Sequence, residues 1–263
     1  MQKQWKDASM SKQTQSKPWY VNWFSSKLYL ELYKHRNEDD ARNLINLIQR
    51  TIPLKKGDKV LDVCCGAGRY SIELARRGFN VTGFDLSKFL ISEAKKNSKA
   101  LPEKFIKVNF LNKDMRKFDF NNSFDLAANL FTSFGYFSED EENFLVIKNV
   151  SASLKKNGYF VFDFLNGNYL KKNIVPYDKK LFLGKEFTSR RTIKGDFVRK
   201  EITVKSGSKK ISYEEVLKLY DINTLKKAFA GNRLKIIHSF GDYFGNKYNK
   251  EKSQRLILIA QKF

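Results

Sequence analysis

The chain has 263 residues, 41% of them hydrophobic, and its 50 Lys and Arg against 28 Asp and Glu give a formal net charge of +22. No stretch approaches the roughly 18 uninterrupted apolar residues that span a bilayer. The two cysteines, Cys64 and Cys65, are adjacent, a spacing that suits neither a structural disulfide nor a zinc site. These features predict a cytoplasmic protein with a sizeable core, without a membrane partner and without a metal.

The N-terminal region divides into a polar segment and a helical one. Met1 to Lys17 is rich in lysine and lacks the apolar h-region of a signal peptide, so we expect a disordered tail. Residues 18–52 are expected to form a helical cap of two helices. Aromatic and apolar residues recur at three- and four-residue steps from Trp19 to Tyr33, and the acidic run Asn37 to Asp40 is typical of a second helix start.

The most informative segment follows. From Val60 to Tyr70 an apolar strand runs into a turn with Gly66 and Gly68 and then into a helix, so that backbone N–H groups at the helix start face a ligand. About twenty residues later a second strand ends at Asp85, where ribose hydroxyls would lie. The pattern predicts a nucleotide-cofactor site, with Asp85 as its best-supported residue.

The details of the turn favour one cofactor over another. A dinucleotide site needs a third glycine for close helix–strand packing, and this chain has Ser71 there. The carboxylate of Asp62 would repel a pyrophosphate but attract a ligand with an amino group and a sulfonium. Both observations point to S-adenosylmethionine (SAM) rather than NAD.

At this point the chain resembles the class I SAM-dependent methyltransferases, of the type that acts on small molecules. Their first motif is an apolar pair, an acidic residue and a Gly-rich turn, matched here by Val60, Leu61, Asp62, Gly66 and Gly68. Cys64 stands where the family more often has its first glycine, and we expect an ordinary φ there. The resemblance is close over residues 53–165 and loose elsewhere.

Later segments follow the family's order. Asp114, within Lys113 to Arg116, corresponds to the acidic residue that hydrogen-bonds the adenine amino group. Asn129 ends the fourth strand, where the substrate site begins. The cofactor-binding residues implied in the sheet and its turns are Asp62, Cys65, Gly66, Gly68, Asp85, Leu86, Asp114, Met115 and Asn129.

In relatives with this arrangement an N-terminal aromatic helix covers the cofactor. The resemblance therefore implies that Tyr20, Trp23 and Arg36 contact the methionine end. Packing on the sheet is the competing role of Tyr20 and Trp23, and a solvated or capping position is that of Arg36.

Alternating strand and helix signals imply right-handed βαβ units and a doubly wound, mainly parallel α/β sheet. The expected strands cover 60–64, 80–85, 105–110, 124–130 and 158–164, and the expected helices 69–77, 88–98 and 139–154. Asn157 and Gly158 supply a turn before the fifth strand. By resemblance, a helix at 223–231 and strands at 234–239 and 255–262 complete a seven-stranded sheet with an antiparallel edge pair, so that 53–165 and 222–263 form the SAM-binding domain.

Residues 166–221 do not fit this alternation. β-rich runs at 186–189, 197–204 and 215–220, separated by glycine-containing turns, predict an inserted antiparallel β lid. Long insertions at the functional edge of a scaffold often carry specificity. A structural flap or a dimer contact is the alternative, and the oligomeric state stays open.

The expected chemistry needs no prominent catalytic motif. A methyl sulfonium is already electrophilic, so the protein must align an acceptor, exclude water and supply a base where the acceptor carries a proton. Tyr136, His238 and Tyr243 are the candidate catalytic residues. A pocket-wall role competes for Tyr136, and a packed, hydrogen-bonded role competes for His238.

The function expected first is transfer of a methyl group from SAM to a small-molecule acceptor, with S-adenosylhomocysteine as product. The lid and the absence of an Asn/Asp-Pro-Pro-aromatic motif after the fourth strand support it. An RNA or protein methyltransferase that uses the basic surface is the alternative, but the lysines are dispersed, so nucleic acid is the less favoured partner. A non-catalytic SAM-binding protein is the second alternative.

Overall fold

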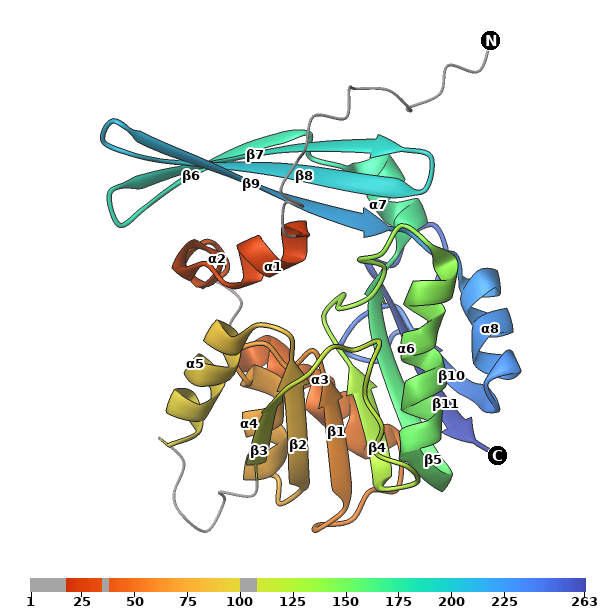
Figure 1. The fold of residues 1–263 in the computed structure, drawn as a ribbon. Helices are drawn as coiled ribbons and strands as arrows, with labels where there is room; N and C mark the ends of the chain where they lie inside the picture. Colours follow the sequence, from red (N-terminus) through yellow and green to blue (C-terminus); the bar gives the residue numbers. More distant parts are fainter. Residues whose placement is uncertain (1–17, 35–37, 100–107) are drawn as a thin grey trace, which may run out of the picture.

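A seven-stranded sheet is the centre of the computed structural model, which describes residues 18–34, 38–99 and 108–263 (Figure 1). Its strand order is β10-β11-β5-β4-β1-β2-β3. Strands β1 to β5 pair in parallel, and β11 is antiparallel to both β5 and β10. The strands are β1 (Lys59–Val63), β2 (Asn80–Asp85), β3 (Val108–Asn112), β4 (Phe124–Asn129), β5 (Leu154–Leu165), β10 (Leu234–Phe240) and β11 (Arg255–Lys262). The expected doubly wound α/β fold with its antiparallel edge pair is confirmed.

Helices cover both faces of this sheet. They are α3 (Glu38–Thr51), α4 (Arg69–Arg76), α5 (Lys88–Ser98), α6 (Asp140–Ser153) and α8 (Ile222–Gly231). Along β5, Phe160 and Phe162 pack with α6 and α8, whereas Val161 packs in the core shared with α3, α4 and α5. Because side chains alternate along a strand, a central strand covered on both faces is apolar at successive positions.

The N-terminal helices differ from the expectation. The segment predicted as one helix from Trp19 to Tyr33 forms two, α1 (Trp19–Phe24) and α2 (Lys27–Leu32). The hydroxyl of Ser26 accepts a hydrogen bond from the backbone N–H of Leu28, 3.2 Å away, and so starts a second helix. Both helices lie between the seven-stranded sheet and a second sheet (Figure 1).

The second sheet, called the lid sheet, is antiparallel with the order β6-β7-β8-β9. It consists of β6 (Tyr177–Phe182), β7 (Lys185–Lys194), β8 (Phe197–Ser206) and β9 (Lys209–Lys218), preceded by α7 (Gly167–Asn173). The inserted antiparallel lid is confirmed, while α7 and β6 are additions to the prediction. The two ends of the insertion meet, since a Cβ on Gly167 would lie 3.4 Å from the Cβ of Leu219.

Two boundaries also differ. No turn separates α6 from β5, because the helix ends at Ser153 and the strand begins at Leu154. The expected Asn157–Gly158 turn is instead an irregularity inside β5, where Asn157 has a φ of 64° and the pairing with β4 shifts register. Residues 105–107 of the expected third strand and the predicted tail lie outside the described residues. Within the described ranges, no helix is long and apolar enough to cross a membrane.

Gly135 joins the loop after β4 to the lid sheet, and its replacement tests this connection. Its carbonyl accepts a 2.7 Å hydrogen bond from the N–H of Lys218, its φ is 82°, and a Cβ would lie 2.5 Å from the carbonyl oxygen of Lys218. We expect Gly135→Ala to lower the free energy of unfolding by about 2 kcal/mol or more, measured by urea denaturation. Gly231→Ala, where a Cβ would meet open space in a helix, is the control and should leave stability equal or higher. Equal stability of the two variants would contradict the prediction.

Candidate active site

The Gly-rich turn lies at the carboxyl ends of β1, β2 and β4, where a parallel sheet of this kind binds ligands. Asp85 ends β2 and is 9% exposed. Its carboxylate accepts hydrogen bonds from the backbone N–H of Gly66, at 3.0 Å, and of Ser87, at 2.9 Å. Burial raises the pKa of this carboxyl group, while the two backbone hydrogen bonds favour its charged form. One carboxylate therefore ties the turn after β1 to the turn after β2.

Cys64 corrects one expectation about that turn. Its φ is 62°, not the ordinary negative value that the side chain would favour, and Gly66 and Gly68 also have positive φ. The turn geometry thus imposes a left-handed conformation at a cost of roughly 1 kcal/mol or more for a residue with a Cβ. Gly68 precedes α4, and a Cβ there would lie 2.8 Å from the ring of Phe110.

The dinucleotide pattern has its third glycine at the position of Ser71, and in this structure a glycine on β2, Gly83, lies against that serine. The hydroxyl of Ser71 lies 2.7 Å from where a Cβ on Gly83 would stand. Helix α4 can approach the sheet because the strand, rather than the helix, lacks a side chain at this contact. The same hydroxyl donates a 2.6 Å hydrogen bond to Asp62.

Asp62 is 1% exposed and lines neither of the cavities described below. The pKa of Asp62 is raised to about 7, mainly because the carboxyl group is buried. The hydrogen bond from Ser71 lowers the pKa and the charge of Asp85 raises it, and burial and the charge together outweigh the hydrogen bond. The structure thus places this residue behind the turn, as a support of α4.

A small cavity of about 90 Å³ gathers several of the predicted cofactor residues. Its lining includes Tyr20, Gly66, Asp85, Leu86, Asp114 and Met115. Asp114 forms an ion pair with Arg116, with Nη2 and Oδ2 2.7 Å apart. Burial acts to raise the pKa of Asp114, but the hydrogen bonds and charge of Arg116 hold it below its usual range. An ionised carboxylate at this position can accept hydrogen bonds from an amino group.

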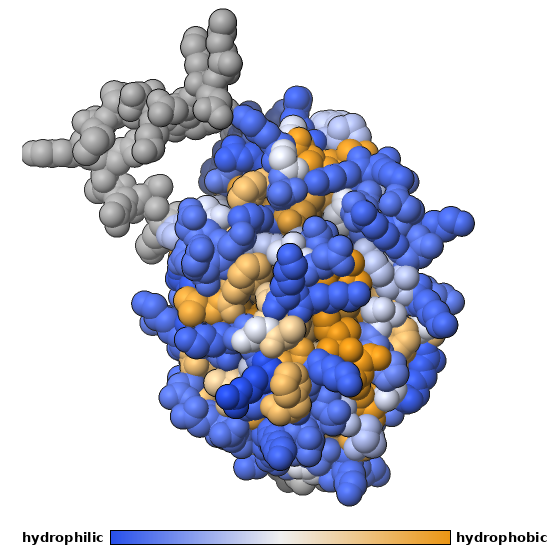
Figure 2. Space-filling view, turned by 90° about the vertical axis from the view of Figure 1, so that its right-hand side faces the viewer, coloured by the Kyte–Doolittle hydropathy of each residue, from blue (hydrophilic) through white to orange (hydrophobic). Residues whose placement is uncertain are grey.

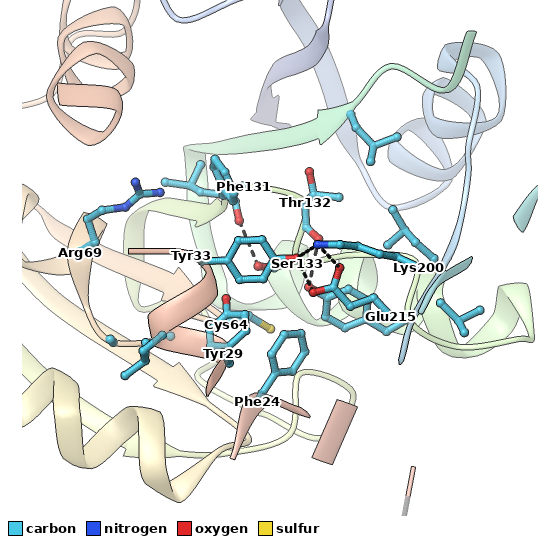
Figure 3. A pocket seen from close by; sticks show the side chains of 18 of the residues that line it. Phe24, Tyr29, Tyr33, Cys64, Arg69, Phe131, Thr132, Ser133, Lys200 and Glu215 are labelled. Carbon is cyan, nitrogen blue, oxygen red and sulfur yellow. Dashed lines mark hydrogen bonds and ion pairs between the residues drawn. The ribbon is translucent and has the colours of Figure 1, made fainter. Parts of the chain in front are cut away.

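A larger cavity of about 530 Å³ adjoins the first, and Cys64, Gly66 and Tyr136 line both. One wall is formed by the Gly-rich turn, including Cys65, and by the loop after β4. The opposite wall comes from α1, α2 and strands β8 and β9. Figure 3 shows side chains from all of these parts converging on this space.

The loop after β4 is held in a strained form. Phe131 and Thr132, both lining the larger cavity, have φ of 56° and 67°. Their backbone N–H groups donate to the fully buried Asp163, whose carboxylate pairs with Arg255 at 2.7 Å. Strain of this kind persists where surrounding contacts enforce it, and it is common at functional sites.

Asn129 supports the same region from behind the cavities. Its side-chain amide donates to the carbonyls of Val63, at 3.3 Å, and Ser133, at 3.0 Å. Its Oδ1 atom is buried without a hydrogen-bond partner in the described part of the chain. A buried acceptor without a partner is costly, and it is a common mark of a ligand or water site.

The predicted catalytic residues do not come together. Tyr136 lines both cavities, but its hydroxyl donates to the carbonyl of Thr132 at 3.1 Å, and burial raises its pKa well above the usual value. Tyr243 donates to Asp163 at 2.9 Å and lines neither cavity. His238 lines a separate depression with Leu47 and stacks on Phe240.

The remaining predictions from the N-terminal helices have different outcomes. Trp23 is fully buried and donates to Glu215 on β9, whereas Tyr20 lines the small cavity. Arg36 lies outside the described residues. Among the described residues, no group of three or more His, Cys, Asp or Glu side chains could hold a metal ion.

Sequence reasoning missed polar residues on the lid side of the larger cavity, above all Tyr33, Lys200 and Glu215. A signal for Lys200 was present. Lys200 lies on the same face of β8 as the buried Val198 and Ile202, because alternate residues of a strand share a face. A charged residue is unusual on a strand face that covers a core.

Comparison with known proteins agrees with this geometry. Residues 60–158 match the family model described as a methyltransferase domain. Among curated relatives, YqeM of Bacillus subtilis, a methyltransferase by name, is 34% identical over 140 residues, covering 52% of this chain and 53% of that protein. A ubiquinone biosynthesis O-methyltransferase of Coxiella burnetii is 32% identical over 132 residues, covering 48% of this chain and 50% of that protein. The chain thus spans about half the length of these relatives.

Solved structures show the same fold over more of the chain. A SAM-dependent methyltransferase of Clostridium acetobutylicum superposes with a TM-score of 0.75 at 22% identity, covering 89% of this chain and 96% of that one. The SAM-bound amino pentose methyltransferase CalS10 of Micromonospora echinaspora gives a TM-score of 0.68 at 21% identity, with 90% and 98% covered.

The buried acid behind the turn leads to a pH-dependent stability. The pKa of Asp62 is about 7 in the folded chain and about 3.9 in an unfolded one. The protonated acid therefore stabilises the fold fully at pH values below the unfolded pKa. This contribution is lost as pH rises through the folded pKa. We expect the parent chain to lose about 2 kcal/mol of unfolding free energy between about pH 5 and pH 8 that Asp62→Asn does not lose, measured by urea unfolding. The variant keeps an oxygen that can accept the hydrogen bond from Ser71.

Asp119→Asn, the same substitution at an exposed carboxylate, is the matched control for the loss of a charge. A stability difference of Asp62→Asn that is the same at both pH values would show that the raised pKa is wrong.

Proposed function

We propose that the chain transfers a methyl group from SAM to a small-molecule acceptor, a function supported by its match to a methyltransferase-domain model over residues 60–158 and by its sheet order. The observation that carries the proposal is the position of Asp85. This residue lines the small cavity beside the Gly-rich turn at the strand ends. This is the place and the residue type for the two ribose hydroxyls of a nucleoside.

The residues around the two cavities fit SAM in two respects. A Cβ on Gly66 would meet open space, so the backbone of the turn is accessible to a ligand. The small cavity offers the carboxylates of Asp85 and Asp114 for ribose hydroxyls and an adenine amino group.

The methionine end of the ligand would point to the larger cavity. Arg69, the first residue of α4, lines it with its guanidinium 5.1 Å from the ring centre of Phe131. This cation is suited to a carboxylate. When bound, SAM supplies an electrophilic methyl group, and the chain's own residues orient the acceptor and exclude water.

The walls of the larger cavity support a small acceptor. The lid sheet and α1 and α2 face the Gly-rich turn across it, and its volume lies in the range of small-molecule sites. The aromatic side chains of Trp19, Phe24 and Tyr29 provide apolar surface for such a molecule. Two of the superposed enzymes are named for sugar substrates, an amino pentose methyltransferase and the sugar N-methyltransferase KedS8 of a Streptoalloteichus species.

An RNA acceptor is the second candidate, and it is favoured by basic residues on the outer strands of the lid sheet. Lys179, Lys180, Lys209 and Lys210 are exposed there. A tRNA (uracil(54)-C(5))-methyltransferase of Pyrococcus horikoshii is 46% identical over 62 residues, which is 24% of this chain and 15% of that one. Hydrophilic side chains are also spread over most of the face in Figure 2, with hydrophobic areas between them. Charge dispersed in this way attracts phosphates without recognising a sequence.

The cofactor assignment predicts a selective loss of binding. Asp85→Asn removes the charge that strengthens hydrogen bonds to ribose, so we expect a ~10- to 100-fold loss of S-adenosylhomocysteine affinity by titration calorimetry. Asp125→Asn is the matched control at the opposite end of the sheet, where Asp125 pairs with Lys155. Equal affinities of a folded Asp85→Asn variant and the parent chain would reject the ribose role.

The activity itself is tested with SAM that carries a labelled methyl group. The chain is incubated with a cell extract that is then separated into metabolite, RNA and protein fractions, with Asp85→Asn in parallel. We expect label in the metabolite fraction that depends on the parent chain. Label confined to RNA would instead support the second candidate, and label in no fraction would reject a transfer activity.

A further inference from the structure

Three polar side chains meet on the lid side of the larger cavity. Tyr33 follows α2, Lys200 lies on β8 and Glu215 lies on β9, and Figure 3 shows their side chains pointing toward one another. Lys200 and Glu215 are direct partners in the β8–β9 register. Both occupy strand positions that face the interior, in phase with Val198 and Leu217. The cluster is thus built into the strand pairing and faces the site.

Hydrogen bonds orient the carboxylate of Glu215. Its Oε1 accepts from Trp23 Nε1 at 2.7 Å and from the hydroxyl of Tyr33 at 2.5 Å. Lys200 Nζ donates to the same hydroxyl at 2.6 Å and lies 3.8 Å from Glu215 Oε2. That last distance is longer than a hydrogen bond. One carboxylate oxygen is fixed by two donors, while the other keeps lone-pair capacity for a further donor.

Glu215 is the one carboxylate among the described residues that line the larger cavity. Tyr136, the predicted catalytic residue in that lining, already donates to the carbonyl of Thr132, and its raised pKa disfavours the phenolate. Arginine side chains of the lining, such as Arg69 and Arg255, stay protonated and cannot accept a proton. An acceptor that must lose a proton therefore has one well-placed carboxylate to receive it.

A purely structural role explains the cluster less well. Other contacts already attach the N-terminal helices to the lid sheet, including the ion pair of Glu31 with Lys185 at 2.6 Å and the hydrogen bond of Ser26 with Tyr213 at 3.1 Å. Desolvated charges are costly, and apolar side chains would serve attachment equally well. Charged groups at the wall of a cavity are more often kept for binding or catalysis.

We propose that Glu215 is the general base of the reaction and that the acceptor carries a hydroxyl or amine group. The inference rests on the proposed function. The acceptor's lone pair forms the bond to the methyl carbon, the electron pair of the broken C–S bond goes to sulfur, and the acceptor's proton goes to Glu215 Oε2. Trp23 and Tyr33 are positioning residues, because they hold the other oxygen of the carboxylate.

The test compares Glu215→Gln with Glu31→Gln, the same substitution at a carboxylate that joins α2 to the lid sheet but does not line the cavity. The rate of label transfer from SAM to the metabolite fraction is measured, and S-adenosylhomocysteine binding is measured by calorimetry. We expect Glu215→Gln to slow transfer by about 100-fold or more, as for loss of a general base. It should retain the S-adenosylhomocysteine affinity of the parent chain.

Glu31→Gln should transfer label at close to the parent rate, and Tyr33→Phe should give an intermediate loss of transfer with unchanged S-adenosylhomocysteine affinity. Transfer by Glu215→Gln at the parent rate, or an equal loss in both glutamine variants together with weaker S-adenosylhomocysteine binding, would overturn the base role and leave the proposed function standing. If the parent chain neither binds S-adenosylhomocysteine nor transfers label, the proposed function fails and the base role fails with it.

Discussion

The hydrogen bonds from Gly66 and Ser87 to the buried carboxylate of Asp85 are the interaction on which the site depends. They join two strand-to-helix turns that are separated in sequence by α4 and β2. Burying a charge is unfavourable, and backbone donors offset that cost while they fix both turns in one geometry. The sheet thus presents an ordered acidic group before any ligand arrives, which reduces the entropy lost on binding.

A second buried carboxylate, Asp163, has the corresponding role beside the larger cavity. Its carboxylate accepts from the N–H of Phe131 and its backbone carbonyl accepts from that of Thr132, two residues in left-handed conformations, and the carboxylate is itself neutralised by Arg255 from β11. Because β11 lies beside β5, the edge of the sheet that is added last in sequence stabilises the loop that lines the larger cavity. The two halves of the site are therefore supported by opposite halves of the sheet.

The fold could be predicted largely because the sheet is covered on both faces. Continuous apolar runs marked the central strands, and Gly-rich and acidic residues at their ends marked the small cavity, where Tyr20, Asp85 and Asp114 meet. Ser26, a residue type that often caps helices, is a sequence signal for the split between α1 and α2. The aromatic and apolar residues on both sides of it keep a helical spacing, however, and this spacing favours a single helix. The edge strand β6 has too little burial to show a period of two.

The lid side of the site could not be derived in the same way. Lys200 and Glu215 meet only through the β8–β9 register, and Tyr33 reaches them from a segment more than a hundred residues away. Local patterns do not contain such pairings. Similarly, the left-handed φ of Cys64 follows from the tertiary demands of the turn, which overrode the preference of the residue itself.

The meeting of Gly167 and Leu219 at the base of the insertion gives the architecture a modular character. The chain leaves the sheet after β5 and returns beside the same point, so the length and sequence between these residues do not alter the spacing of the core strands. Such a closed excursion lets one half of the site diversify by insertion, deletion or exchange while the nucleoside-facing half stays constant. A scaffold of this kind allows the lid sheet to change without altering the strand ends that form the Gly-rich turn.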